Sequence, residues 1–255
     1  MIDLEIKSLL EEKLHQFNRP DFISADPVCI PHRYSRKEDI EIAGLLAATI
    51  SWGRRDLIVR AAGKMMEMLD DTPFEFVMQA KPKDLKGLEK FVYRTFQGPD
   101  LQSMVLGLRR IYSEEGGLEN VMQLDDEQLD TAQGIVRYRN AMLATKGFTE
   151  RTAKHIADPS SGSSAKRLNM YLRWMVRKDG AGVDFGIWNK MRPDQLICPL
   201  DVHTGNVGRK LGLLMRTQND WKAALELTAS LRMFDPTDPV KYDFSLFGLG
   251  IFEGF

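Results

Sequence analysis

The chain is poor in the residues that hold metal centres. It has two cysteines, Cys29 and Cys198, far apart among its 255 residues, and only four histidines. The cysteines form no CxxC pair and no finger-type spacing, which argues against a structural zinc or an iron–sulfur cluster bound by this chain alone. Cys198 and His203 lie five residues apart without an obvious third ligand. We therefore expect no metal site.

Long apolar runs are also missing. The longest, such as IAGLLAATI at 42–50, are too short to cross a bilayer, and the acidic N-terminus does not read as a signal peptide. The expectation is a cytoplasmic protein that does not act on a membrane. No strand leads into a Gly-rich phosphate loop, since GLGIFEG at 248–254 lies in an apolar segment, and no serine-hydrolase elbow is present.

The overall charge is close to balanced. The formal net charge is −1, which argues against a uniformly basic binder of nucleic acid but leaves room for a local basic face. Hydrophobic residues make up 43% and charged residues 28% of the chain, as in ordinary globular proteins. The length suits one large domain or two modest ones.

Helical periodicity runs through nearly the whole sequence. The segment 37–52 begins with acidic residues and becomes apolar, which indicates a central buried helix, and Gly53 is expected to separate it from the next helix. A loop rich in Gly, Asp and Pro is expected at 179–200. We predict an all-α chain with two helical lobes, one near 37–150 and the other from 1–36 plus 151–255. The expected helices are 2–17, 37–52, 53–71, 72–80, 83–91, 99–114, 117–123, 126–146, 165–178, 203–215, 218–232 and 238–252.

Two charged residues are candidates for chemistry. Lys166 falls in the first turn of an amphipathic helix, where a cation is mildly unfavourable. It is either a solvated charge or a partly desolvated amine that serves as a nucleophile. Asp201 precedes the helix predicted at 203–215 and either caps that helix or faces an amine. Within that helix, Gly205 and Gly208 indicate a close approach of DNA or of another helix, and Gly212 indicates the helix end.

The segment CPLDVHTGNVGRKLGL at 198–213 resembles a motif of the helix-hairpin-helix DNA glycosylase superfamily, in which an aspartate precedes a helix that ends in Arg-Leu-Gly. The lysine-led helix at 166–175 is similar to that of the archaeal 8-oxoguanine DNA glycosylase branch. Segments 45–69 and 241–251 resemble the helix junction and the closing helix of the superfamily. The whole chain also looks like a group of bacterial proteins that carry no assigned function. The matching positions in the first motif are Pro199, Asp201, His203, Val207, Arg209 (one place off the strict spacing), Leu211 and Gly212.

The resemblance implies a two-lobed helical fold of the glycosylase type and base-excision repair of double-stranded DNA. The family's catalytic lysine and aspartate fall on Lys166 and, 35 residues later, Asp201. A damaged base, such as an oxidised purine, would be flipped out of the duplex and cut from its sugar. Asp201 would stabilise the positively charged sugar, and Lys166 would attack C1′ to form a Schiff base that permits strand cleavage. No metal or organic cofactor is required.

The same resemblance implies a set of DNA-binding or base-pocket residues. Trp52 either stacks on the everted base or packs at a helix end. The segment SSGSSAK at 160–166 stands where the superfamily has its hairpin, with Ser164 in place of the second glycine, so the hairpin is atypical. The implied residues are Ser51, Trp52, Gly53, Arg54, Arg55, Gly162, Ser164, Arg167, His203, Arg209 and Lys210.

Two other interpretations remain open at this point. The neutral net charge and the atypical hairpin favour a non-catalytic module that binds nucleic acid or a protein on a glycosylase-like scaffold. A helical regulatory or assembly protein would use GNVGRK at 205–210 for close helix packing. The Lys166 and Asp201 pair favours the enzyme over both.

Overall fold

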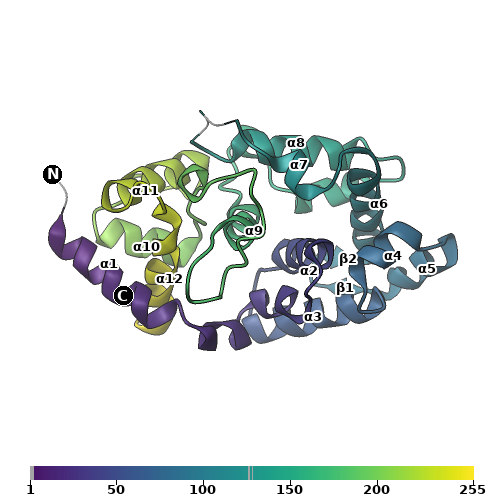
Figure 1. Cartoon of the computed structure of the whole chain (residues 1–255), viewed down its shortest axis with the longest axis horizontal. Coiled ribbons are helices and arrows are strands. Elements are labelled where there is room, and N and C mark those ends of the chain that lie inside the picture. The colour runs from purple at the N-terminus through teal and green to yellow at the C-terminus, as the bar shows by residue number, and fades with distance from the viewer. Residues whose placement is uncertain (1–2, 126, 128) are drawn as a thin grey trace. The chain divides into compact units, whose positions relative to one another are not determined.

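A computed structural model describes residues 3–125, 127 and 129–255, and the fold is mostly helical, as the sequence predicts. Figure 1 labels the helices and the two short strands. Every helix among the described residues is too short or too polar to span a bilayer. The elements are α1 (Leu4–Phe17), α2 (Lys37–Thr49), α3 (Arg55–Met68), α4 (Pro73–Gln79), α5 (Pro82–Gly87), β1 (Val92–Tyr93), β2 (Phe96–Gln97), α6 (Gly98–Glu114), α7 (Leu118–Met122), α8 (Ala132–Leu143), α9 (Lys166–Val176), α10 (Val202–Lys210), α11 (Trp221–Phe234) and α12 (Asp243–Phe252).

The chain divides into two compact units. The first consists of Met1–Phe22, Leu124–Ala132 and Asp158–Phe255, and the second of Ile23–Gln123 and Gln133–Ala157. Residues 23–36, which the sequence analysis placed with the C-terminal segment, belong to the second unit because their short 3-10 turns pack on α2 and α3. Residues 124–132 belong to the first unit, where the Gln195 side chain donates to the Asp125 carbonyl and Thr131 donates to Asn169.

In the first unit, α12 packs against both α1 and α10 (Figure 1). Gly248 permits the contact with α1, since a Cβ at this position would lie 2.1 Å from the Phe17 ring. Ser245 donates a hydrogen bond to the Leu10 carbonyl at 2.6 Å, and the Tyr242 hydroxyl donates to the Glu11 carboxylate. The first and last helices of the chain therefore share one hydrophobic core.

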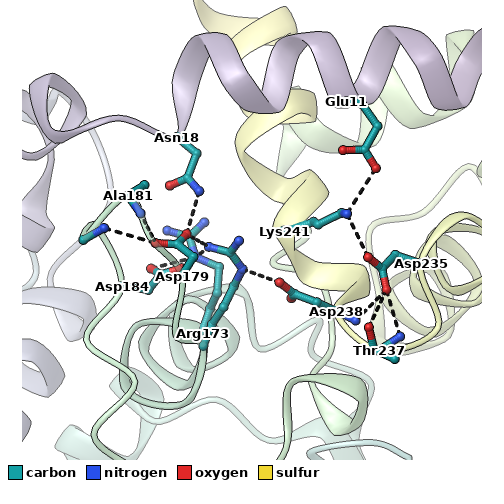
Figure 2. A network of polar contacts seen from close by, with 12 residues as sticks. Glu11, Asn18, Arg173, Asp179, Ala181, Asp184, Asp235, Thr237, Asp238 and Lys241 are labelled. Carbon is teal, nitrogen blue, oxygen red and sulfur yellow. Dashed lines mark hydrogen bonds and ion pairs between the residues drawn. The ribbon is translucent and has the colours of Figure 1, made fainter.

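The predicted loop at 179–200 contains no α-helix and is fixed to the end of α9. The backbone amides of Phe185 and Trp188 donate to the carbonyls of Trp174 and Met175. These two carbonyls lie in the last turn of α9, where no amide of the helix itself can bond them. Charged groups complete the attachment (Figure 2). The buried Arg173 and Arg177 bond the aspartates of this loop and of the segments around α12: Asp179, Asp184, Asp238 and Asp243.

The second unit is built around α2. Its residues from Ile40 to Thr49 are all buried, which confirms the prediction of a central buried helix. Gly53 lies between α2 and α3 with φ of +101°, a conformation that residues with a side chain adopt only under strain, so the predicted break is also confirmed. Pro73 occupies the first turn of α4, where a missing backbone N–H costs no helix bond, and Thr72 before it makes no side-chain capping bond.

Several predicted boundaries were wrong. The helix expected at 83–91 ends at Gly87, and Val92–Tyr93 instead pairs with Phe96–Gln97 in a hairpin too short to show strand alternation. The helix expected at 126–146 begins at Ala132, because the Asp130 carboxylate accepts its amide; residues 126 and 128 lie outside the described residues. The helix expected at 203–215 ends at Lys210. Gly212 follows with φ of +70°, the left-handed conformation common just after a helix, which agrees with the prediction that this glycine marks the helix end.

Candidate active site

Lys166 is the first residue of α9, and the helix behind it is anchored in the core. Residues from Leu168 to Val176 are buried throughout, so α9 holds a fixed position in the first unit. Ala165, immediately before the lysine, has the left-handed φ of 49°, which turns the chain sharply into the helix. The Lys166 amine lies 3.5 Å from the Met170 sulfur, one turn further on. The lysine therefore leaves a rigid helix start at a defined angle.

Asp201 is the residue before α10, and its two carboxylate oxygens have different partners. Oδ1 accepts the backbone amides of His203 at 2.9 Å and Thr204 at 3.0 Å, which caps the helix. Oδ2 faces Lys166, with 3.7 Å between it and the amine nitrogen. Asp201 thus caps α10 and also faces an amine, so both roles that the sequence suggested for it are present at once.

The Lys166–Asp201 pair is close without being tightly bonded. Its 3.7 Å separation is longer than a hydrogen bond but within the range of an ion pair. The lysine side chain is 23% exposed and the aspartate side chain 26% exposed. Ser164, in the turn before α9, donates to the Leu200 carbonyl at 3.3 Å and so connects the two segments that carry the pair. Both charged groups are therefore partly exposed to solvent.

A buried carboxyl group lies beneath the pair. Burial raises the pKa of Asp243 to about 6, although the positive charges of Arg173 and Lys166 act in the opposite direction. The nearby Asp201 charge raises this pKa further. Burial also raises the pKa of the Cys198 thiol well above its ordinary value, so this cysteine is a core residue. Sequence reasoning did not single out Asp243, although this residue follows a short 3-10 turn within the 241–251 segment that resembles the closing helix of the superfamily.

The other candidates in the first unit differ in exposure. Gly162 and His203 are exposed, and Lys210 is an exposed residue whose amine lies 5.4 Å from the Phe255 ring centroid. Arg167 is half-buried, and burial lowers its pKa. Arg209 bonds within the protein: it donates to the Arg216 carbonyl at 2.8 Å and to the Asn219 side chain at 2.6 Å. Its guanidinium is thus largely committed to holding the loop after α10.

The candidates at 51–55 form the turn between α2 and α3 in the second unit. The half-buried Trp52 ring stacks on His155, with 5.9 Å between the ring centroids, and meets Tyr93 edge-on at 5.6 Å. Ser51 donates to the Ala47 carbonyl at 2.7 Å. Arg54 is exposed and forms an ion pair with Asp56 at 3.0 Å, and Arg55 is half-buried at the first position of α3.

The Trp52 turn is fixed by contacts of its own. The Tyr93 hydroxyl donates to the Trp52 carbonyl at 2.7 Å. A Cβ at Gly53 would lie 2.5 Å from an Arg94 guanidinium nitrogen, so the glycine leaves room for that side chain. His155 in turn lies 3.5 Å from the buried Asp100 carboxylate. The Trp52 ring is therefore one layer of a packed aromatic and ionic cluster.

No group of three or more His, Cys, Asp or Glu side chains with a metal-binding arrangement occurs within 3–125, 127 and 129–255. Comparison with curated proteins and with solved structures found no match. The model of the family described as "Protein of unknown function (DUF2400)" matches residues 26–252, which include both members of the Lys166–Asp201 pair and the Trp52 turn. With most of its length matched, the chain belongs to the DUF2400 family.

Proposed function

We propose that the protein is a DNA glycosylase with AP-lyase activity that removes a damaged base through Lys166 and Asp201. The observation that carries this proposal is the 3.7 Å separation between the Lys166 amine and Asp201 Oδ2, both accessible at the starts of two helices. The resemblance of 166–175 and 198–213 to the glycosylase motifs assigns the same two residues. A nucleophilic amine beside a fixed carboxylate is the arrangement that covalent base excision needs.

The first chemical step breaks the glycosidic bond, and the bonding electrons leave with the base, which takes up a proton from solvent. Positive charge then develops on the sugar at C1′ and O4′, where the Asp201 carboxylate stabilises it. Lys166, after losing its ammonium proton to solvent, donates its lone pair to C1′. The new C1′–N bond carries an ammonium group, whose proton passes to Asp201 Oδ2.

The second step opens the sugar and cuts the strand. The C1′–O4′ bond breaks, O4′ takes up a proton, and the C1′–N bond becomes a Schiff base. Loss of a proton from C2′ then expels the 3′ phosphate, and water releases the sugar fragment from Lys166. Asp201 can serve both steps because the His203 and Thr204 amides hold Oδ1 and leave Oδ2 directed at the amine.

The turn before α9 presents an exposed edge beside the start of that helix, where the DNA backbone could approach. Asp158 accepts the Ser160 amide and the Ser160 and Ser161 hydroxyls, which closes a tight turn. Gly162 follows with φ of +89° and an open, exposed surface. The amides of residues 160–163 donate within the turn, so a phosphate would instead be held by the first amides of α9, and the exposed His203 and Lys210 add polar and positive groups on α10.

The decisive experiment is borohydride trapping with duplexes that hold 8-oxoguanine, uracil or an abasic site. Borohydride reduces the Schiff base to a stable covalent adduct, which we expect with wild type on at least one duplex. Lys166→Gln should lose the adduct, and Lys222→Gln, which changes an exposed lysine on α11, should retain it. No adduct with any duplex, or an adduct that survives Lys166→Gln, overturns the proposal.

A second candidate is a non-catalytic module that binds nucleic acid. The internal bonding of Arg209 and the Arg54–Asp56 ion pair favour it, since both reduce the positive charge offered to phosphates. Electrophoretic mobility shifts distinguish the two functions. A binding module would retard damaged duplexes without releasing a base, and Lys166→Gln would bind them as tightly as wild type.

A further inference from the structure

The segment Asn219–Trp221 at the start of α11 contacts both of the loops that carry the Lys166–Asp201 pair. Toward the lysine, the Trp221 amide donates to the Gly162 carbonyl at 3.0 Å, and Asp220 pairs with Ser163 in an isolated antiparallel bridge. Ser163 in turn accepts the Ala165 amide through its hydroxyl, one residue before Lys166. The turn into α9 is therefore fixed relative to the start of α11.

Toward the aspartate, the Asn219 side chain makes the contact. Its amide nitrogen donates to the Asp201 carbonyl at 3.1 Å, and its oxygen accepts from the Arg209 guanidinium at 2.6 Å. The Asp201 carbonyl also accepts the Gly205 amide at 2.9 Å, the first bond of the helix. Asp201 is thus held through its main chain as well as through Oδ1.

The absence of a side chain at Gly205 is what allows this contact. A Cβ there would lie 2.8 Å from the Asn219 oxygen and 2.9 Å from an Arg209 nitrogen, closer than such contacts normally occur. A glycine inside a helix normally weakens it, and the space needed by Asn219 and Arg209 explains why α10 has one at this position. The sequence analysis ascribed it to close approach by DNA or a helix, and the neighbour is the Asn219–Arg209 pair.

We propose that Asn219 is a positioning residue, which fixes the Asp201 main chain so that Oδ2 stays directed at the Lys166 amine. This inference rests on the proposed function and adds a residue that no motif indicated. Asn219 bonds the Asp201 main chain and therefore acts through Asp201. Because a misplacement of about 1 Å at a reacting group can cost roughly 100-fold in rate, loss of this bond should reduce turnover far more than DNA binding.

Two substitutions at one position separate positioning from mere support of the loop. Asn219→Asp keeps an oxygen that accepts from Arg209 but loses the donor to the Asp201 carbonyl. Asn219→Ala loses both. Positioning predicts that both variants lower the single-turnover trapping rate, by about 100-fold, with the affinity for damaged duplex changed less than about threefold. If Asn219→Asp retains the wild-type rate, the side chain only supports Arg209 and the proposal is overturned.

The two glycines of α10 provide a matched pair of variants. Gly205→Ala should displace Asn219 and lower the trapping rate about tenfold. Gly208→Ala brings the same gain in helix propensity, but its new methyl group meets the flexible Leu227 side chain at 3.2 Å, so its rate should stay within about twofold of wild type. Equal rates for the two variants would contradict the inference.

A measurement without substrate separates failure of the inference from failure of the proposed function. The His203 and Thr204 amides donate to Asp201 Oδ1, so their hydrogen exchange reports whether Asp201 is held. We expect exchange at these amides to be at least tenfold faster in Asn219→Ala and Asn219→Asp than in wild type. Unchanged exchange overturns the positioning role, even if wild type forms the adduct. Faster exchange in a protein that traps no lesion keeps the role and refutes the glycosylase function.

Discussion

The two ends of α9 carry ion pairs of opposite character. At its start, Lys166 lies 3.7 Å from Asp201, and roughly a quarter of each side chain is exposed. At its end, Arg173 and Arg177 are 4% and 3% exposed, and each bonds more than one carboxylate. One helix therefore presents a loose, partly exposed pair and a buried ionic network.

The difference separates a pair suited to chemistry from a network suited to structure. The Nε and Nη1 atoms of Arg173 and Arg177 donate to aspartates from four places in the chain, which ties the 179–200 loop and the segment leading into α12 to α9. The Lys166 amine donates one hydrogen bond to the Met170 sulfur at 3.5 Å and lies 3.7 Å from the Asp201 carboxylate, beyond hydrogen-bonding distance. Groups held in this way can exchange partners with a substrate.

The largest expected effect is the loss of stability when the buried ionic network is opened. Arg177→Met leaves the buried Asp184 and the partly exposed Asp238 each without one countercharge, and we expect it to lower the free energy of unfolding by about 3–5 kcal/mol. Lys166→Met removes a partner whose side chain is about one quarter exposed and should cost about 1 kcal/mol or less. Urea unfolding followed by circular dichroism measures both. Equal costs would contradict the distinction between the two ends.

The second expected effect is a pH dependence from Asp243, which touches both regions. Its pKa rises from the ordinary 3.8 to about 6 in the folded protein, so the folded state binds this proton more tightly than the unfolded chain does. Stability from this group is present below about pH 4 and is lost as the pH rises through about 6. An asparagine at this position cannot ionise, so the Asp243→Asn protein should not lose this stability as the pH rises.

Chemical unfolding between pH 4 and pH 7 measures this effect. The unfolding free energy of Asp243→Asn relative to wild type should rise by about 2–3 kcal/mol over that range, since one pKa unit corresponds to about 1.4 kcal/mol. Glu12→Gln, at an exposed position of α1, should show no such trend. Parallel curves for wild type and Asp243→Asn would refute the assignment.

The smallest expected effect separates the two roles of Asp201. Asp201→Ala removes the α10 cap and should lower stability by about 1 kcal/mol, whereas Asp201→Asn keeps an oxygen for the His203 and Thr204 amides and should change it by only a few tenths. Both substitutions remove the charge, so both should abolish adduct formation. Thermal unfolding and trapping on the same samples test this, and an active Asp201→Asn protein would show that the charge is not needed.

The sequence predicted the helices and the Lys166–Asp201 pair, but not the residues that hold the pair in place. The helical periodicity at 2–17, 37–52 and 165–178 and the cap at Asp201 are local signals, which the residues themselves carry. The proximity of Lys166 to Asp201 came from resemblance, because a contact across 35 residues has no local pattern. Whether the two residues catalyse base excision stays a prediction.

The residues that sequence reasoning missed act through tertiary contacts. Asn219 lies in the polar turn RTQND (216–220), where asparagine is common for its turn-forming ability, so its bond to Asp201 gives no sequence signal. Asp243 is one of several acidic residues near α12, and only the fold shows that it is buried beside Arg173. The short hairpin at 92–97 has too few residues for any periodicity.

The contact between α1 and α12 has a consequence for biosynthesis. The second unit lies within residues 23–157, so all of its chain is synthesised before residues 158–255 of the first unit. The helix α1 is synthesised before the second unit but packs on α12, which is synthesised after it. The apolar face of α1 therefore stays uncovered until α12 has been made, which gives a ribosome-associated chaperone an opportunity to bind α1 during synthesis.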